Sequence, residues 1–186
     1  MTAVLLIFTI SITMGKDNPD TSEVSKKGND SIYEGWNTYR DTVYGFELKY
    51  PSDAIIIKDE YSIIHIALNF TPETKLTEKH MIIKIKVATS DSDCFGQIMW
   101  KDTTRINGVD FHYLPGKKWD HAMGGLDFYA SDYYTRMNDK CYMLFFRLGI
   151  RDATGFTDSP IPPDPPPEDL DTDIFDRILA TFRFLK

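Results

Sequence analysis

The sequence lacks an excess of positive charge. Its 186 residues carry 21 Lys and Arg against 28 Asp and Glu, which gives a formal net charge of -7 and an isoelectric point near 5.0. Nucleic-acid binding requires clustered Lys and Arg that neutralise phosphates, and the sequence has no such cluster. The charge balance therefore argues against a nucleic-acid partner and is typical of an acidic protein whose charge keeps it in solution.

The apolar run at residues 3–14 is shorter than the roughly 20 residues that a membrane-spanning helix needs. Residues 1–15 are predicted to hold the hydrophobic region of a secretory signal peptide, with Thr13 and Gly15 as small residues near its end, although the usual positive residues before the run are missing. The polar residues 16–35 predict a flexible linker and disfavour the alternative of a buried first element. We expect an exported protein, periplasmic or extracellular, with no stable membrane span in the mature chain.

Cysteine is scarce, with two residues in the whole chain, Cys94 and Cys141. In the oxidising compartment that export implies, an even number of cysteines predicts one disulfide, Cys94 to Cys141. The alternative is a pair of buried free thiols, which a cytosolic chain would favour. A redox role is disfavoured because the spacing is unlike that of a Cys-x-x-Cys motif.

Recognisable catalytic motifs are also missing. The sequence has neither the Gly-x-Ser-x-Gly motif nor a glycine-rich loop that cradles phosphate, so we predict a non-enzymatic protein with no catalytic residue, cofactor or metal. The alternative is a metal-dependent hydrolase built on the loop region between His112 and His121. Its zinc ligands would be His112, Asp120, His121 and Asp127, which lack the short paired spacing of known zinc sites.

The strongest pattern present is an aromatic hairpin over residues 124–150, with Asn138, Asp139 and Lys140 as its predicted tip. Its second strand is apolar on both faces until Arg147, as in a strand that is covered on both sides. We therefore place this strand in the centre of a sheet. The missing glycine at the tip leaves the register of the hairpin open.

Further alternating segments predict an α+β fold, a single domain over residues 36–186 with a mainly antiparallel sheet covered by helices on both faces. Strands are expected at 42–50, 61–70, 80–87 and 109–113, the last after the turn dipeptide Asn107–Gly108. A loop or short helix is expected at 91–100 and a loop at 115–125. Prolines exclude a central strand or helix at 159–168 and predict an exposed rigid loop, followed by a helix that begins at Asp171 or Thr172.

Both ends of this domain resemble the bacterial PsbP-like family. The motifs are VYGFELKYPSD and FDRILATFRF, with signature residues Tyr44, Gly45, Phe46, Tyr50, Pro51 and Ser52, and Phe175, Ile178, Leu179, Thr181 and Phe182. The resemblance covers residues 36–186 and implies an α/β/α sandwich, in a fold group that includes the nuclear-import factor that binds Ran, and a role in binding rather than catalysis. The proline insertion and the predicted disulfide depart from the photosystem members, and no metal or photosystem contact is carried over.

Aromatic residues are more numerous than one core needs, and they are favoured anchors at protein contacts. Trp119 stands in the predicted loop beside Lys117 and Lys118, and Tyr133 follows on the first strand of the hairpin. We predict these four as binding residues for a protein partner outside the cytoplasm, with the chain itself a monomer. The alternative for Trp119 is a side chain folded back on the edge of the sheet.

Overall fold

The computed structural model describes residues 30–58, 63–96, 102–122, 126–151 and 160–186, without the side chains of residues 30, 31, 115–122 and 126. The predicted signal peptide and most of the predicted linker lie outside the described residues. A compact unit extends from Tyr33 to Lys186. No helix in the described part of the chain is long and apolar enough to cross a membrane.

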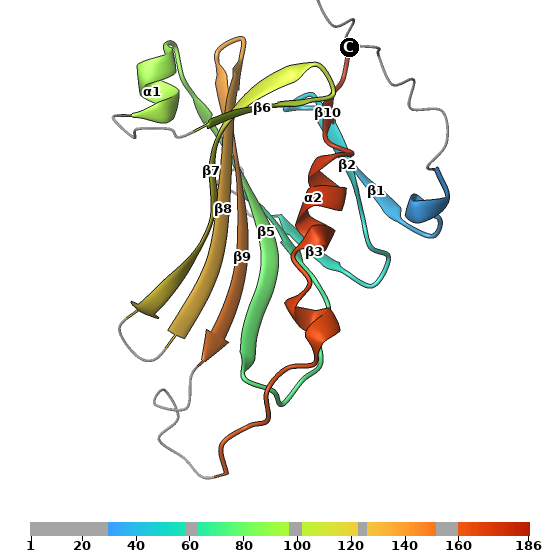
Figure 1. Cartoon of the computed structure of the whole chain (residues 1–186). Helices are drawn as coiled ribbons and strands as arrows, with labels where there is room; N and C mark the ends of the chain where they lie inside the picture. The colour runs from blue at the N-terminus through green and yellow to red at the C-terminus, as the bar shows by residue number, and fades with distance from the viewer. Residues whose placement is uncertain (1–29, 59–62, 97–101, 123–125, 152–159) are drawn as a thin grey trace, which may run out of the picture. The chain divides into compact units, whose positions relative to one another are not determined.

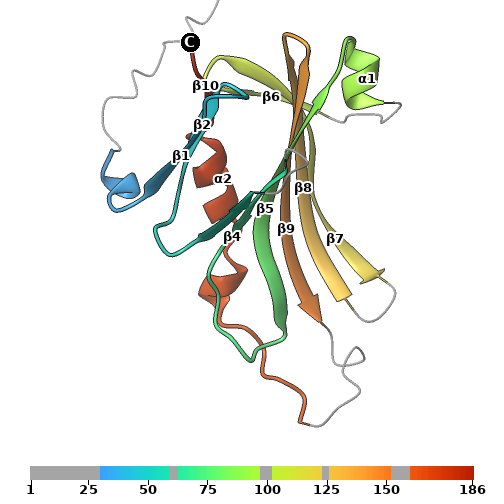
Figure 2. The ribbon, with the colours of Figure 1, turned by 180° about the vertical axis from the view of Figure 1, so that it is seen from behind.

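A seven-stranded antiparallel sheet forms the centre of this unit (Figures 1 and 2). The strands follow one another across the sheet in the order β3 (Ile55–Lys58), β4 (Ile63–Ala67), β5 (Leu76–Val87), β9 (Lys140–Arg151), β8 (Leu126–Met137), β7 (Val109–Ala122) and β6 (Asp102–Ile106). The mainly antiparallel α+β fold predicted from the sequence is therefore confirmed. Strand β9 has three strands on each side, as its apolar residues on both faces predicted.

The β8–β9 hairpin pairs Met137 with Lys140, so its tip has two residues, Asn138 and Asp139. The predicted three-residue tip is wrong, because Lys140 belongs to the strand. Asn138 adopts a φ of 57°, in the left-handed region that asparagine tolerates better than most residues. A glycine is therefore not required at this turn. The two-residue turn fixes the register of β8 against β9.

The other two-residue turn lies between β6 and β7, at the dipeptide Asn107–Gly108. Both residues have positive φ, 47° and 83°, as the turn type predicted from this dipeptide requires. The Asn107 side chain donates hydrogen bonds to the carbonyls of Ala180 and Phe182, at 2.9 and 2.7 Å. The turn thereby holds the C-terminal end of the chain against this edge of the sheet.

One face of the large sheet is covered by helix α2 (Asp173–Leu179) together with a three-stranded sheet of β1 (Asn37–Asp41), β2 (Phe46–Tyr50) and β10 (Arg183–Phe184). Helix α2 buries Phe175, Ile178 and Leu179. Phe182, which follows the helix, stacks on Phe46 of β2 with ring centroids 5.3 Å apart. The two sequence motifs at the ends of the domain therefore meet in one core.

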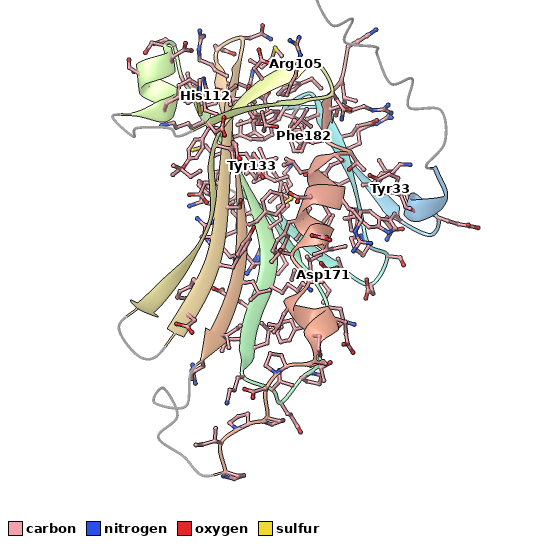
Figure 3. The ribbon with its side chains drawn as sticks, in the orientation of Figure 1. Tyr33, Arg105, His112, Tyr133, Asp171 and Phe182 are labelled. Carbon is pink, nitrogen blue, oxygen red and sulfur yellow. A yellow bond between two sulfur atoms is a disulfide. The ribbon has the colours of Figure 1, made fainter. Side chains whose placement is uncertain are left out.

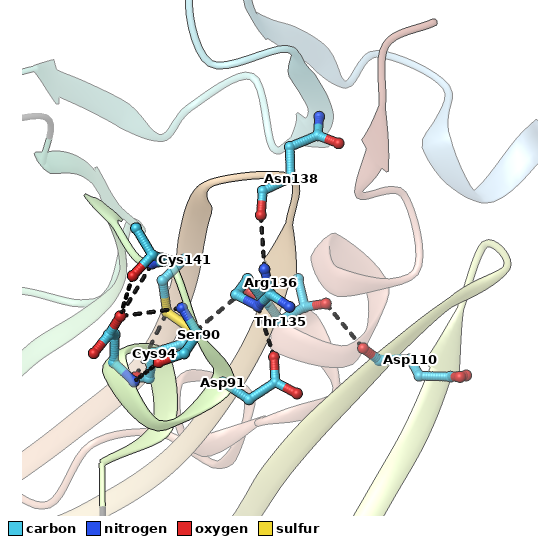
Figure 4. The surroundings of a disulfide bond; sticks show 10 residues. Ser90, Asp91, Cys94, Asp110, Thr135, Arg136, Asn138 and Cys141 are labelled. Carbon is cyan, nitrogen blue, oxygen red and sulfur yellow. Dashed lines mark hydrogen bonds and ion pairs between the residues drawn. A yellow bond between two sulfur atoms is a disulfide. The ribbon is translucent and has the colours of Figure 1, made fainter.

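The opposite face carries the short helix α1 (Asp91–Phe95) at one end (Figure 4). Ser90 and Asp93 form a capping box, in which each side chain accepts a hydrogen bond from the backbone N–H of the other. Cys94 of α1 is bonded to Cys141 of β9, and both residues are buried. The predicted disulfide is confirmed, and it fastens the helix to the central strand.

Two loop predictions are corrected. Strand β7 continues through residues 115–122, where a loop was expected, and its register with β8 shifts between Leu114 and Lys117. Such a shift lets Pro115, which has no N–H to donate, sit within a strand. The proline segment is only partly exposed, because Pro165 is buried and the Pro163 carbonyl accepts a hydrogen bond from the Lys75 N–H. It leads into the short 3-10 helix η3 (Pro167–Leu170).

Glu47 of β2 is buried between two arginines. It accepts hydrogen bonds from the guanidinium groups of Arg183 and Arg40, the latter at 2.7 Å. The Arg183 guanidinium first, and then that of Arg40, holds the pKa of Glu47 below its ordinary value of 4.5. This stabilisation is present above pH 4.5 and is lost as the pH falls through the lowered pKa of the folded state.

We expect Glu47→Gln to lower the free energy of unfolding at pH 7 by about 1 kcal/mol, a modest loss because both arginines are mostly exposed. The loss should shrink as the pH falls from 6 to 3, because the wild-type carboxylate is itself protonated there. Urea unfolding across this range measures both effects. Asp164→Asn, which removes a carboxylate paired with Lys75 but 83% exposed, is the control and should change little. An equal loss at every pH would contradict the assignment.

We expect the double variant Cys94→Ser, Cys141→Ser to lose about 2–4 kcal/mol of unfolding free energy, because the bond closes a loop across a sequence separation of 47. Wild-type protein unfolded with a reductant should show the same loss, which separates the bond from the substitutions. Non-reducing peptide mapping should recover the two cysteine peptides linked. Equal stability of the oxidised and reduced proteins would show that the disulfide contributes nothing.

Candidate functional site

A cavity of about 330 Å³ opens between helix α2 and strands β6, β7 and β8, on the covered face of the large sheet. We call it the tyrosine cavity. Its lining consists of three tyrosines, two hydroxyl residues, two apolar residues and one carboxylate: Tyr113, Tyr129 and Tyr133, Thr104 and Ser131, Ile106 and Leu179, and Asp176. Figure 3 shows Tyr133 on the side of the sheet that faces α2.

Strand alternation places the tyrosines. Tyr129, Ser131 and Tyr133 occupy every second position of β8, so their side chains share one face. Tyr113 of β7 is paired directly with Tyr133, and the two rings stack with centroids 5.3 Å apart and planes within 9°. Tyr133 also meets Phe146 of β9 edge to face, which fixes its ring from the other side.

The residues at the floor of the cavity are more buried than those at its rim. Tyr133 is 7% exposed, and burial raises its pKa to about 12, while a hydrogen bond with the Ser131 side chain acts in the opposite direction. Tyr113 and Tyr129 are half-buried, and Asp176 at the rim is exposed to solvent. A ligand that enters would therefore meet the carboxylate first and the tyrosine rings behind it.

Asp176 has no cationic neighbour in the cavity. Burial of one side of its carboxyl group against the cavity raises its pKa, and the nearby Asp173 raises it further. The next residue, Arg177, is turned toward Asp171, which lies 3.3 Å from its Nη2. Neither Lys nor Arg lines the tyrosine cavity among the described residues. The site is therefore negative, with aromatic rings and phenol oxygens as its other ligand-facing groups.

This set of groups is suited to binding. Aromatic faces and a carboxylate attract cations, and the hydroxyl groups can donate or accept hydrogen bonds. Activation of Ser131 or Thr104 as a nucleophile would require a neighbouring base. Neither His nor Lys is among the described residues that line the cavity.

The predicted binding residues lie on two neighbouring strands. Tyr133 lies in the tyrosine cavity, but the backbone of β7 pairs Lys117 with Ala130, Lys118 with Tyr129 and Trp119 with Phe128. These positions lie three to five residues from Tyr133 along β8, roughly 10–17 Å at strand spacing. The side chains of Lys117, Lys118 and Trp119 are outside the described part, so their role in binding stays a prediction.

The extended strand separates the two histidines of the alternative metal site. His112 is paired with Tyr134. Ala122, which follows His121, is paired with Leu126, so His112 and Ala122 are separated by roughly 26 Å along the strand. Two imidazoles cannot bridge that distance to one ion. The His112 ring instead lies against Phe95, with centroids 4.5 Å apart. The described residues contain no cluster of three or more His, Cys, Asp or Glu that could hold a metal.

Sequence reasoning found Tyr133 but missed Tyr113 and Asp176 as its neighbours. The spacing of Tyr129 and Tyr133 on one strand was a usable signal, because alternate residues share a face. Asp176 gave no comparable signal, since a charged residue in a short terminal helix is ordinarily a solvated one. Its place at the cavity depends on how α2 lies on the sheet.

No known family model matches the sequence, and no curated protein matches it. Among solved structures, a protein of Bacteroides thetaiotaomicron VPI-5482 matches 82% of this chain with 12% identity and a TM-score of 0.52, which shows a shared fold. The match covers 49% of that protein, so this chain spans about half of its length. The solution structure of cyanobacterial PsbP (CyanoP) from Synechocystis sp. PCC 6803 matches 81% of this chain and 92% of its own, with 13% identity and a TM-score of 0.48. That score is too low to assign the chain to the PsbP family.

We expect Asp176→Asn to gain stability relative to wild type as the pH rises from 3 to 7. A carboxyl group whose pKa is raised on folding stabilises the protein at low pH, and this contribution is lost as the pH rises through the unfolded and then the folded pKa. The gain should stay below about 1 kcal/mol because Asp176 is exposed. Urea unfolding at both pH values measures it.

Proposed function

We propose that this chain is an exported, non-enzymatic binding module. Its partner is a protein outside the cytoplasm that inserts a basic side chain, Arg or Lys, into the tyrosine cavity. The observation that carries this proposal is the combination of three tyrosines with the carboxylate of Asp176 in a cavity that, among the described residues, no basic side chain lines.

A basic side chain satisfies each part of the cavity. Tyrosine faces attract an ammonium or guanidinium group, and the attraction strengthens where water is excluded, as at the buried Tyr133. Asp176 at the rim supplies the opposite charge, which an anionic ligand would meet with repulsion. The net charge of -7 favours encounter with a basic partner over long range. A neutral ligand would leave Asp176 uncompensated.

Export is supported by the disulfide and by the apolar run at residues 3–14. The Cys94–Cys141 bond is a kind that forms and persists in oxidising compartments rather than in the cytosol. A binding role is favoured over the alternative hydrolase because β7 holds His112 and His121 far apart. The proposed module acts as a monomer, with one cavity for each chain.

Two matched probes test the cavity: N-acetyl-arginine amide and its uncharged analogue N-acetyl-citrulline amide. We expect the arginine probe to bind about tenfold more tightly in an NMR titration, since cation–π and carboxylate attractions act on the guanidinium group alone. Asp176→Asn and Tyr129→Ala should each weaken arginine binding toward the citrulline level. Asp173→Asn is the control and should bind as wild type. Equal binding of both probes, or none of either, would refute a cavity for basic side chains.

Trp119→Ala tests the contact predicted from the sequence. If Trp119 is a contact residue, the variant should lose capture of a partner from the secreted or envelope fraction and keep a melting temperature within a few degrees of wild type. The arginine probe should still bind, because the Trp119 backbone pairs with Phe128 and lies away from Tyr133. Undiminished capture would remove Trp119 from the binding surface.

A further inference from the structure

Lys79 of β5 is a buried cation without a direct partner. It points to the covered face of the large sheet and is 6% exposed. Its ammonium group makes no hydrogen bond or ion pair within the described part of the chain. Lysine is almost never buried unless it is paired, since burial of an uncompensated ammonium group is strongly unfavourable. The Lys79 Nζ atom is not among the fully buried atoms that lack a partner, so it is accessible from the cavity that Lys79 lines, where a ligand can accept its hydrogen bonds.

Lys79 lines a second cavity, of about 290 Å³, on the other flank of α2. We call it the lysine cavity. Its walls come from the segments after β2 and β4, from η3 and from α2, with Lys79, Asp169, Asp171, Arg177, Asp53 and Glu168 as its charged residues. Figure 3 shows Asp171 at the junction of η3 and α2. This cavity is distinct from the tyrosine cavity and shares no lining residue with it.

A second donor at the lysine cavity is also unmatched. The Nε atom of Arg177 is buried and has no hydrogen-bond partner among the described residues, although Nη2 of the same guanidinium lies 3.3 Å from Asp171. Buried polar groups in folded proteins nearly always have partners, and exceptions call for an explanation. Two such donors, one from β5 and one from α2, line one cavity.

The two nearest carboxylates, the buried Asp169 and the partly exposed Asp171, accept hydrogen bonds from other groups. Asp169 accepts a hydrogen bond from the Thr71 N–H at 2.8 Å, and Asp171 accepts one from the Asp173 N–H at 2.8 Å in addition to that from Arg177. Asp169 and Asp171 act on Lys79 only through space. The burial of Lys79 outweighs them and lowers its pKa, and the charge of Arg177 lowers it too.

We infer that the lysine cavity binds a small zwitterion of the α-amino-acid type, with the ligand carboxylate between the Lys79 ammonium and the Arg177 Nε–H. A carboxylate supplies the acceptors that both donors lack. The exposed acids Asp53 and Glu168 at the rim favour a ligand that also carries an ammonium group. The same acids disfavour a phosphate dianion, which would meet four carboxylates in the cavity lining.

Three matched probes separate the parts of this inference. L-Alanine carries both charges, propanoate lacks the ammonium group, and L-alaninamide lacks the carboxylate. We expect alanine to bind most tightly in an NMR titration, propanoate more weakly, and alaninamide about 10- to 100-fold more weakly than alanine, since the charge-assisted bonds to Lys79 and Arg177 are lost. Inorganic phosphate should not compete with alanine.

Lys79→Met should reduce alanine binding by about 10- to 100-fold while the protein stays folded, because the apolar side chain has a similar volume and removes an unpaired buried charge. Lys84→Met is the matched control, since Lys84 lies on the same strand with an exposed side chain on the opposite face. Asp176→Asn should leave alanine binding unchanged, which separates this site from the tyrosine cavity.

The inference is overturned if alanine fails to bind the wild-type protein at millimolar concentration, or if alaninamide binds as well as alanine. These two results need no variant, so they hold even if Lys79→Met does not fold. Alanine binding that survives in a folded Lys79→Met protein, or that phosphate displaces, also overturns it. If Lys84→Met lost alanine binding to the same extent as Lys79→Met, the loss would reflect the net charge of the protein, and this result would also exclude the site.

Discussion

The structure depends on covering one apolar face of a seven-stranded sheet. Strands β5, β8 and β9 present large buried side chains on that face, among them Leu144 and Phe146, which are fully inaccessible to water. Helix α2 has seven residues and cannot cover so wide a surface alone. The three-stranded sheet covers the remaining surface. Its third strand, β10, follows α2 and pairs with β2 from the start of the domain. The first and last segments of the domain therefore pack together over the large sheet.

Helix α2 covers the large sheet incompletely, and the two cavities lie beside it. Because α2 is short and apolar mainly through Phe175, Ile178 and Leu179, the sheet on either flank is lined by polar and aromatic residues rather than filled. One flank holds three tyrosines with the carboxylate of Asp176, and the other holds Lys79 with Arg177. Within the described lining, the first cavity carries one carboxylate, and the second carries two cations beside four carboxylates. A single short helix therefore separates two cavities of different chemistry.

The two buried charged residues Glu47 and Lys79 have different surroundings. Glu47 is enclosed by two arginines, and this pairing lowers its pKa and stabilises the junction of the small sheet. Lys79 lacks such a partner, and burial lowers its pKa instead. A charge that folding leaves uncompensated reduces stability, and natural proteins retain such costs mainly at functional sites. The Cys94–Cys141 bond lies on the other face and offsets part of this loss without contact with either cavity.

The sequence alone determined whatever depends on local pattern. Apolar residues on both faces placed β9 at the centre of an antiparallel sheet, and Asn107–Gly108 predicted a turn, because these signals act between residues close in sequence. The disulfide could be predicted because two cysteines allow only one pairing. Tertiary structure decided the rest. The sequence predicted a loop from Pro115, but β7 continues through this residue and pairs with β8. Glu47 is buried because Arg183, which is distant in the sequence, pairs with it. Lys79 and Asp176 line the two cavities only because α2 packs on the sheet, and no local pattern encodes where a distant helix will pack.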